Sequence, residues 1–130
     1  MMKYVCLGYV DEKMRVNMID SEQASLTIQQ FYYVEELKRM GFFLSGEDLQ
    51  DSQNTTTVRK QDGKISVTAG PHKHMKEQFG SFILIEAKDL NHAIRLISTH
   101  PSLQIGNTWE IRPVAHYQSK VTPRFPGKKY

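Results

Sequence analysis

The pattern of apolar and polar residues along the chain predicts four main β-strands. Residues 3–10 and 81–87 are almost continuously apolar, which is typical of central strands covered on both faces. Residues 42–49 form a third strand. Residues 109–114 form a fourth, in which Trp109 and Ile111 alternate with Glu110 and Arg112. One of these two sets should therefore face the helices, and the other should face the opposite side of the sheet.

Two helices are predicted between these strands. The first begins with Asp20 as N-cap, with Gln23 three positions on, and Gly41 ends it. The second begins after Asp89 and ends at His100-Pro101, because the residue before a proline avoids helical angles. Apolar residues recur at helical spacing in both, at Leu26, Tyr33, Leu37 and Met40 in the first and at Leu90, Ala93, Ile94 and Ile97 in the second.

A β-hairpin is predicted between the strand at residues 42–49 and the strand at residues 81–87. Residues 56–59 and 65–68 alternate in period two, and Asp62-Gly63 between them suits the positive φ angles of a tight turn. The order is then strand, helix, strand, hairpin, strand, helix, strand. This order predicts an α+β, ferredoxin-like domain, in which an antiparallel sheet carries two helices on one face.

The second face of this sheet needs a cover as well. The segments "YVCLGYV" and "FILIEA" are apolar on both faces, whereas two helices cover only one. The economical cover is a second copy of the chain, sheet against sheet, in a two-fold homodimer. A cleft at that interface is the expected place for a small-molecule ligand.

Charge divides the chain into two parts. The formal net charge of the 130 residues is +3, but Lys120, Arg124, Lys128 and Lys129 lie in an acid-free segment at the end. Without these four, 13 basic residues face 14 acidic ones. We therefore expect one near-neutral domain over residues 1–114 and a basic extension over residues 115–130 that is solvated or packed on a partner. Nucleic-acid binding is not expected, since basic and aromatic residues are not interleaved.

The single cysteine and the lengths of the apolar runs indicate the cellular compartment that is expected for the protein. Cys6 is alone, so an internal disulfide and a cysteine-based zinc site are excluded, and a reducing cytoplasm is expected. No apolar run approaches the ~20 residues of a membrane-spanning helix, so no membrane segment is expected.

Several segments occur in the order and spacing of a known family. These are "MKYVCLGYV", "FLSGEDLQ", "TTTVRKQDGKISVTAGP", "KEQFGSFILIEAKDLNHAI" and "HPSLQIGNTWEIRPV". With them the chain resembles the YCII-related family, in the branch named after a DGPF motif. The resemblance implies a dimeric ferredoxin-like α/β barrel but assigns no biochemical function. It also implies a transcription-factor partner, because some members are encoded beside or fused to sigma factors. More distant relatives look like isomerase-like enzymes with a His-Asp pair.

The chain departs from that branch at the naming motif. Asp-Gly-Pro-Phe is replaced by Ala69-Gly70-Pro71-His72, and His74 stands where the branch usually carries Glu. A carboxylate mechanism of the family therefore cannot be carried over to Ala69 or His74. The departure gains two imidazoles, which could both reach one ligand if this segment is extended.

Two chemistries are open to His72 and His74. A catalytic zinc needs three protein ligands, and Glu47 or His100 would have to supply the third. Neighbouring lysines would repel a cation, so we expect no metal and no cofactor. The alternative is acid–base chemistry, in which Glu47 orients a histidine that titrates near neutral pH. Glu47, His72 and His74 are thus the catalytic candidates, and all three could instead be surface residues.

Further ligand-binding candidates are Pro71, His100 and Arg112. Pro71 adjoins the histidine pair. His100 lies at a helix end, where an imidazolium would stabilise the last carbonyls, or it could contact a ligand. Arg112 would bind an anion if it faces the dimer cleft, or pair with Glu110 or Glu86 at an edge.

Two classes of function follow. The first hypothesis is a non-catalytic small-molecule-binding or regulatory module that uses the cleft at the dimer interface. The alternative is a small-molecule enzyme with His/Glu acid–base chemistry, similar to the isomerase-like relatives.

Overall fold

The computed structural model of the chain describes residues 1–115. The basic extension predicted for residues 115–130 thus lies, apart from Ala115, outside the described residues. The main chain forms β1 (Met2–Asp11), α1 (Glu12–Val16), α2 (Asp20–Arg39), β2 (Phe43–Asp48), β3 (Thr56–Gln61), β4 (Lys64–Ala69), β5 (Glu77–Ala87), α3 (Leu90–Ile97) and β6 (Thr108–Pro113), with the 3-10 helices η1 (Ser52–Asn54) and η2 (Pro101–Ile105). Within this part, no helix is both long and apolar enough to cross a bilayer.

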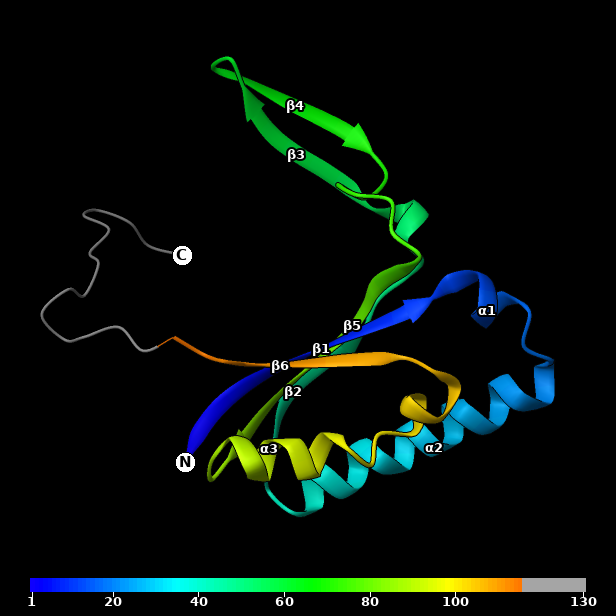
Figure 1. The fold of residues 1–130 in the computed structure, drawn as a ribbon, viewed down its shortest axis with the longest axis vertical. Helices are drawn as coiled ribbons and strands as arrows, with labels where there is room; N and C mark the ends of the chain where they lie inside the picture. The colour runs from blue at the N-terminus through cyan, green and yellow to red at the C-terminus, as the bar shows by residue number, and fades with distance from the viewer. Residues whose placement is uncertain (116–130) are drawn as a thin grey trace, which may run out of the picture.

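The strands form the predicted antiparallel sheet. Its order is β2-β5-β1-β6, and every neighbouring pair is antiparallel. The helices α2 and α3 lie on the same side of this sheet, whereas the β3–β4 hairpin projects away from it (Figure 1). The predicted α+β class, the order of the elements and the single helical layer are therefore confirmed.

The core lies between this sheet and the helices. On β1, alternate residues from Tyr4 to Val10 face the helices and are buried. Register pairs Cys6 with Ile83 and Tyr4 with Ile85, so β5 continues the same apolar surface. The buried residues of the helical layer are Leu37, Ala93 and Ile97. The predicted apolar faces thus meet the sheet in part, whereas three of their residues are exposed, namely Met40, Leu90 and Ile94.

The opposite face of the sheet is apolar at its centre. Val5, Leu7, Phe82 and Leu84 alternate with the core residues and are only half-buried. On β6, Trp109 and Ile111 pack on the core, which settles the alternation left open by the sequence. Arg112 is therefore on the open face, opposite Val5 of β1.

The hairpin turn has the predicted geometry. Asp62 and Gly63 both have positive φ, at 50° and 76°, as a type I′ turn requires. The strand pairing places Val58 opposite Val67 on one face of the hairpin, and Ile65 lies on that face too. All three side chains are exposed in the single chain.

Three local features differ from the sequence prediction. Asp20 is the first residue of α2 rather than its cap, and Ile19 occupies the N-cap without a side-chain bond. The reason is that the Gln23 amide reaches back to the Arg15 and Met18 carbonyls instead of forming a capping box. The short α1 was not predicted, although its signal is present, since the Asp11 carboxylate caps the backbone N–H groups of Lys13 and Met14.

Candidate functional site

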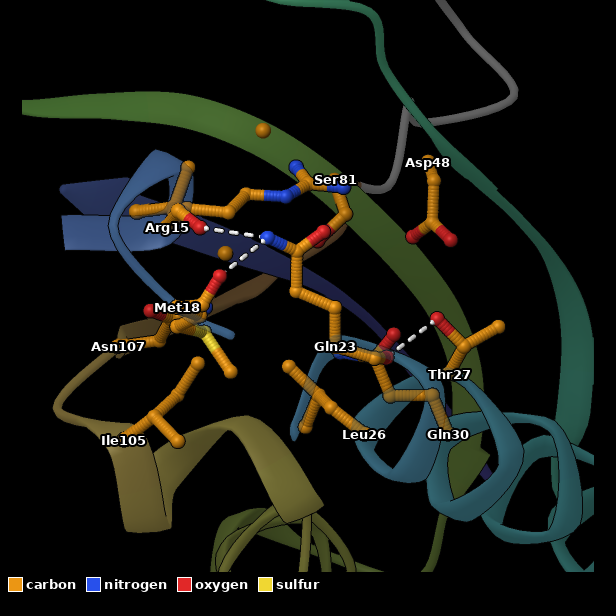
Figure 2. Close-up of a pocket in the computed structure, with 13 residues that line it drawn as sticks. Arg15, Met18, Gln23, Leu26, Thr27, Gln30, Asp48, Ser81, Ile105 and Asn107 are labelled. Carbon is orange, nitrogen blue, oxygen red and sulfur yellow. Dashed lines mark hydrogen bonds between the residues drawn. The ribbon is translucent and has the colours of Figure 1, made fainter. Parts of the chain in front are cut away.

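A cleft lies between α2 and the helix-facing side of the sheet. It has two lobes that share four lining residues, namely Thr27, Gln30, Asp48 and Ser81. The larger, which we call the His100 lobe, has a volume of about 380 Å³ and contains His100 and Trp109. The smaller, the Arg15 lobe, has a volume of about 90 Å³ and is bounded by Arg15, Gln23 and Asn107 (Figure 2). The helix α2 lines both lobes because its apolar face is short and Gln30 interrupts it.

His100 is the only buried histidine of the described residues and is held by a chain of hydrogen bonds. The side chain is 6% exposed and caps η2, with Nδ1 accepting the backbone N–H of Ser102 at 3.1 Å. The Ser102 hydroxyl lies 2.8 Å from the same Nδ1. The Trp109 indole N–H donates to this hydroxyl at 2.9 Å. These three side chains come from the segment after α3 and from β6.

The bonds determine which nitrogen of His100 carries the proton. The backbone N–H of Ser102 can only donate, so Nδ1 of His100 accepts from it, and the Ser102 hydroxyl, which accepts from the Trp109 indole, then directs its own proton to the same nitrogen. Nδ1 then accepts two bonds and is unprotonated, which leaves the proton on Nε2. Among the described residues, no buried side-chain N or O atom lacks a hydrogen-bond partner, and no bond to Nε2 is formed there. Nε2–H therefore reaches the surface of the cleft that His100 lines.

Burial keeps this ring neutral. Desolvation lowers the pKa of His100 from 6.5 to about 4. The ring also packs against Tyr33 and Trp109, with centroid distances of 4.7 and 4.5 Å. The predicted imidazolium at the end of the helix is therefore wrong, since the side chain is neutral at pH 7 and caps the following 3-10 helix instead. In this state it is a fixed hydrogen-bond donor to the cleft.

Gly8 makes room for this arrangement on β1. A Cβ atom at this position would lie 2.7 Å from the Ser81 hydroxyl and 2.8 Å from the Trp109 ring. Only a residue without a side chain lets the indole lie against the strand and direct its N–H to Ser102. The glycine that interrupts the apolar run of β1 is thus explained by the site.

The Arg15 lobe is polar and carries two charges. Arg15 extends from α1 into the cleft, and the Asp48 carboxylate lies on the other side above Thr27 (Figure 2). The two are not ion-paired, because neither pair found within residues 1–115 involves them. The Gln23 amide donates to the Arg15 carbonyl at 3.2 Å and the Met18 carbonyl at 2.9 Å, which ties α1 to the start of α2.

The structure brings together two of the residues predicted from the sequence. Glu47 and His100 both line the His100 lobe. His72 and His74 lie instead on the exposed loop between β4 and β5, and neither lines this cleft. Pro71 is at the start of that loop, and Arg112 is on the opposite face of the sheet. The roles predicted for these four residues stay predictions.

No set of metal ligands comes together in residues 1–115. Three or more His, Cys, Asp or Glu side chains are nowhere in that range close enough to hold one ion. Burial also raises the pKa of the Cys6 thiol to about 12, so this side chain is a neutral part of the core.

Sequence reasoning missed four residues of the site. Ser102 and Trp109 act through their contact with His100, which no spacing rule reveals. Arg15 and Asp48 enter through α1 and the end of β2. Their only sequence signals are the Asp11 cap of α1 and the register of β2, in which Asp48 lies opposite Ser81.

The comparison with protein families decides the family. The sequence model described as the YCII-related domain matches residues 2–118. This chain belongs to the YCII-related family. The resemblance noted from the sequence segments is thus confirmed at the level of the family, whereas the DGPF branch stays a prediction. No curated protein matches this YCII-related chain.

A solved structure is among those that are similar to this YCII-related protein. It is the 5-chloro-2-hydroxyhydroquinone dehydrochlorinase TftG from Burkholderia phenoliruptrix AC1100, in complex with 2,5-dihydroxybenzoquinone. The two sequences are 17% identical, and the match covers 85% of this chain and 91% of that chain with a TM-score of 0.46.

Proposed function

We propose that this YCII-related protein binds a small organic molecule in the cleft between α2 and the sheet. The observation that carries the proposal is the neutral His100, whose Nε2–H is turned to the cleft while Nδ1 is held by Ser102. A donor fixed in this way suits a carbonyl or hydroxyl oxygen of a ligand. It costs little to order on binding, because the ring is already held in place.

The surroundings of His100 support a ligand with an apolar body. The apolar side chains that line the His100 lobe are Phe31, Val34, Phe43, Ile83 and Trp109, and polar residues such as Thr27, Gln30 and Ser81 stand beside them. A volume of about 380 Å³ lies within the range of small-molecule sites. Apolar walls with one buried, oriented donor are the usual composition of such a site.

A titration with 4-hydroxybenzamide, a neutral probe with a ring and acceptor oxygens, tests this proposal. We expect saturable binding to the wild type, followed by NMR, and about tenfold weaker binding to His100→Asn, since one hydrogen bond is lost. The matched control is His92→Asn. His92 also accepts a backbone N–H at Nδ1, at 3.0 Å from Lys88, but does not line this cleft. Equal affinities of the wild type and His100→Asn would refute the proposal.

The placement of Glu47 does not favour the enzyme alternative. Glu47 is a lining residue of the His100 lobe, but strand register pairs it with Phe82, so its carboxylate is directed to the open face of the sheet and away from His100. The low pKa of His100 suits polarisation of a carbonyl rather than proton transfer near pH 7. A transcription-factor partner, which depends only on the family association, stays a prediction.

We also propose that the open face of the sheet is the interface of a homodimer. The half-buried residues Val5, Leu7, Phe82 and Leu84 support this, since they form an apolar centre without a cover in the single chain. A charged side chain introduced at one of these positions would be buried in the dimer without a partner, which would destabilise the dimer by several kcal/mol.

Leu84→Asp should therefore convert a dimer to a monomer in light scattering after size-exclusion chromatography. The control is Leu103→Asp, an exposed position on η2, which should leave the dimer intact. A wild type that elutes as a monomer, or a Leu84→Asp variant that is folded by circular dichroism and still dimeric, would contradict this.

A further inference from the structure

We infer that the Arg15 lobe takes the carboxylate of the ligand, which makes the ligand class a small organic monocarboxylate whose other end reaches His100. The inference rests on the proposed function and adds the chemical class to it. Its basis is that charged side chains are distributed unevenly between the two lobes.

Arg15 is the one cation of its lobe and is available for an anion. It lines the lobe together with polar side chains of α2, and no carboxylate of residues 1–115 is within ion-pair distance of it. Its main chain is held by the Gln23 amide, so the guanidinium starts from a fixed point. An arginine placed in this way can bind a carboxylate with two parallel hydrogen bonds.

The His100 lobe offers no comparable cation. The one cation among its lining residues is Lys38, which is paired with Glu35 at 3.4 Å. An anionic group of the ligand is thus favoured at Arg15 only. The two lobes share Thr27, Gln30, Asp48 and Ser81, so one molecule can extend from Arg15 to His100.

Asp48 limits the number of anionic groups. It lines both lobes and carries the only other charge of the Arg15 lobe. A second carboxylate on the ligand would meet this charge, whereas a hydroxyl or amino group could donate to it. A monoanion with a donor beside the carboxylate fits these features.

The test compares 4-hydroxybenzoate with 4-hydroxybenzamide, which differ in the terminal group, an anionic carboxylate in the first and a neutral carboxamide in the second. We expect the benzoate to bind about tenfold more tightly than the benzamide at low salt, and Arg15→Gln to remove this preference while the benzamide affinity changes less than twofold. The control is Lys13→Gln on the same short helix, because Lys13 lines neither lobe. It should leave both affinities unchanged.

Asp48→Asn provides the reciprocal test. Removal of the repelling charge should make 4-hydroxybenzoate bind about twofold to fivefold more tightly, an effect opposite in sign to that of Arg15→Gln. The inference is overturned if both ligands bind equally, or if Arg15→Gln and Lys13→Gln have the same effect. If one of these results is obtained but His100→Asn still weakens the binding of 4-hydroxybenzamide, the proposed function stands and only the carboxylate preference is withdrawn. When neither compound binds, both are overturned.

Discussion

Lowering the pH from 7 to 4 is expected to destabilise the wild-type protein by about 3 kcal/mol more than the His100→Asn variant. The cause is the burial of His100, which lowers its pKa from 6.5 in the unfolded chain to about 4 in the folded protein. Between these two values the unfolded state binds a proton that the folded state does not. Stability therefore falls as the pH drops through this window, and it is insensitive to this group above pH 7.

Urea unfolding at pH 7 and pH 4 measures this effect. Asn is the suitable replacement because its side-chain oxygen can still accept the Ser102 N–H and cap η2, but it does not titrate. Carboxylates that titrate in the same range contribute equally to both proteins and cancel in the difference. His92→Asn is the control and should follow the wild type. A wild type and His100→Asn with the same pH dependence would show that His100 is not buried as a neutral ring.

Ser102→Ala is expected to lower the free energy of unfolding by about 2–3 kcal/mol. Ser102 is 1% exposed, and its hydroxyl links the Trp109 indole to His100. Removal of the hydroxyl leaves a buried indole N–H without an acceptor and deprives Nδ1 of one of its two donors. An orphaned buried donor costs more than the bond itself contributes.

The matched control is Ser98→Ala. The Ser98 hydroxyl also forms a hydrogen bond, to the Ile94 carbonyl, but the residue is exposed. Its loss should change stability by less than about 0.5 kcal/mol. If unfolding in urea gave equal losses for both serines, the buried network would not contribute as described. Combining Ser102→Ala with His100→Asn should give less than the sum of the two effects, since both residues belong to one network.

The fold could be predicted from local patterns because the elements that define it are strongly marked. Period-two and helical spacing identified the strands and the two main helices, and Asp62-Gly63 identified the hairpin. The face of β6 was ambiguous, because alternation separates Arg112 from Trp109 but does not say which of them is inside. The contact of Trp109 with the core and with Ser102 decides this, and it depends on the space above Gly8.

The site was less accessible to prediction than the fold. The spacing of His72 and His74 predicted a shared binding or acid–base site, yet the loop that carries them is exposed. His100 was placed at a helix end by Pro101, but its neutrality results from burial against Trp109 of the following strand and against Tyr33, which is distant along the chain. Arg15 and Asp48 have no motif at all. They share a lobe only because α1 and β2 end at the same side of α2.

The proposed function depends on a neutral His100 that presents its Nε2–H to a ligand in the cleft. The most direct test is the nitrogen NMR spectrum of the His100 ring at pH 7, recorded through its carbon-bound protons with and without 4-hydroxybenzamide. The structure predicts a protonated Nε2 and an unprotonated Nδ1, with a saturable shift on addition of the compound that is larger at Nε2. A proton on Nδ1, or ring nitrogens that do not respond to the compound, would contradict the proposed role of His100.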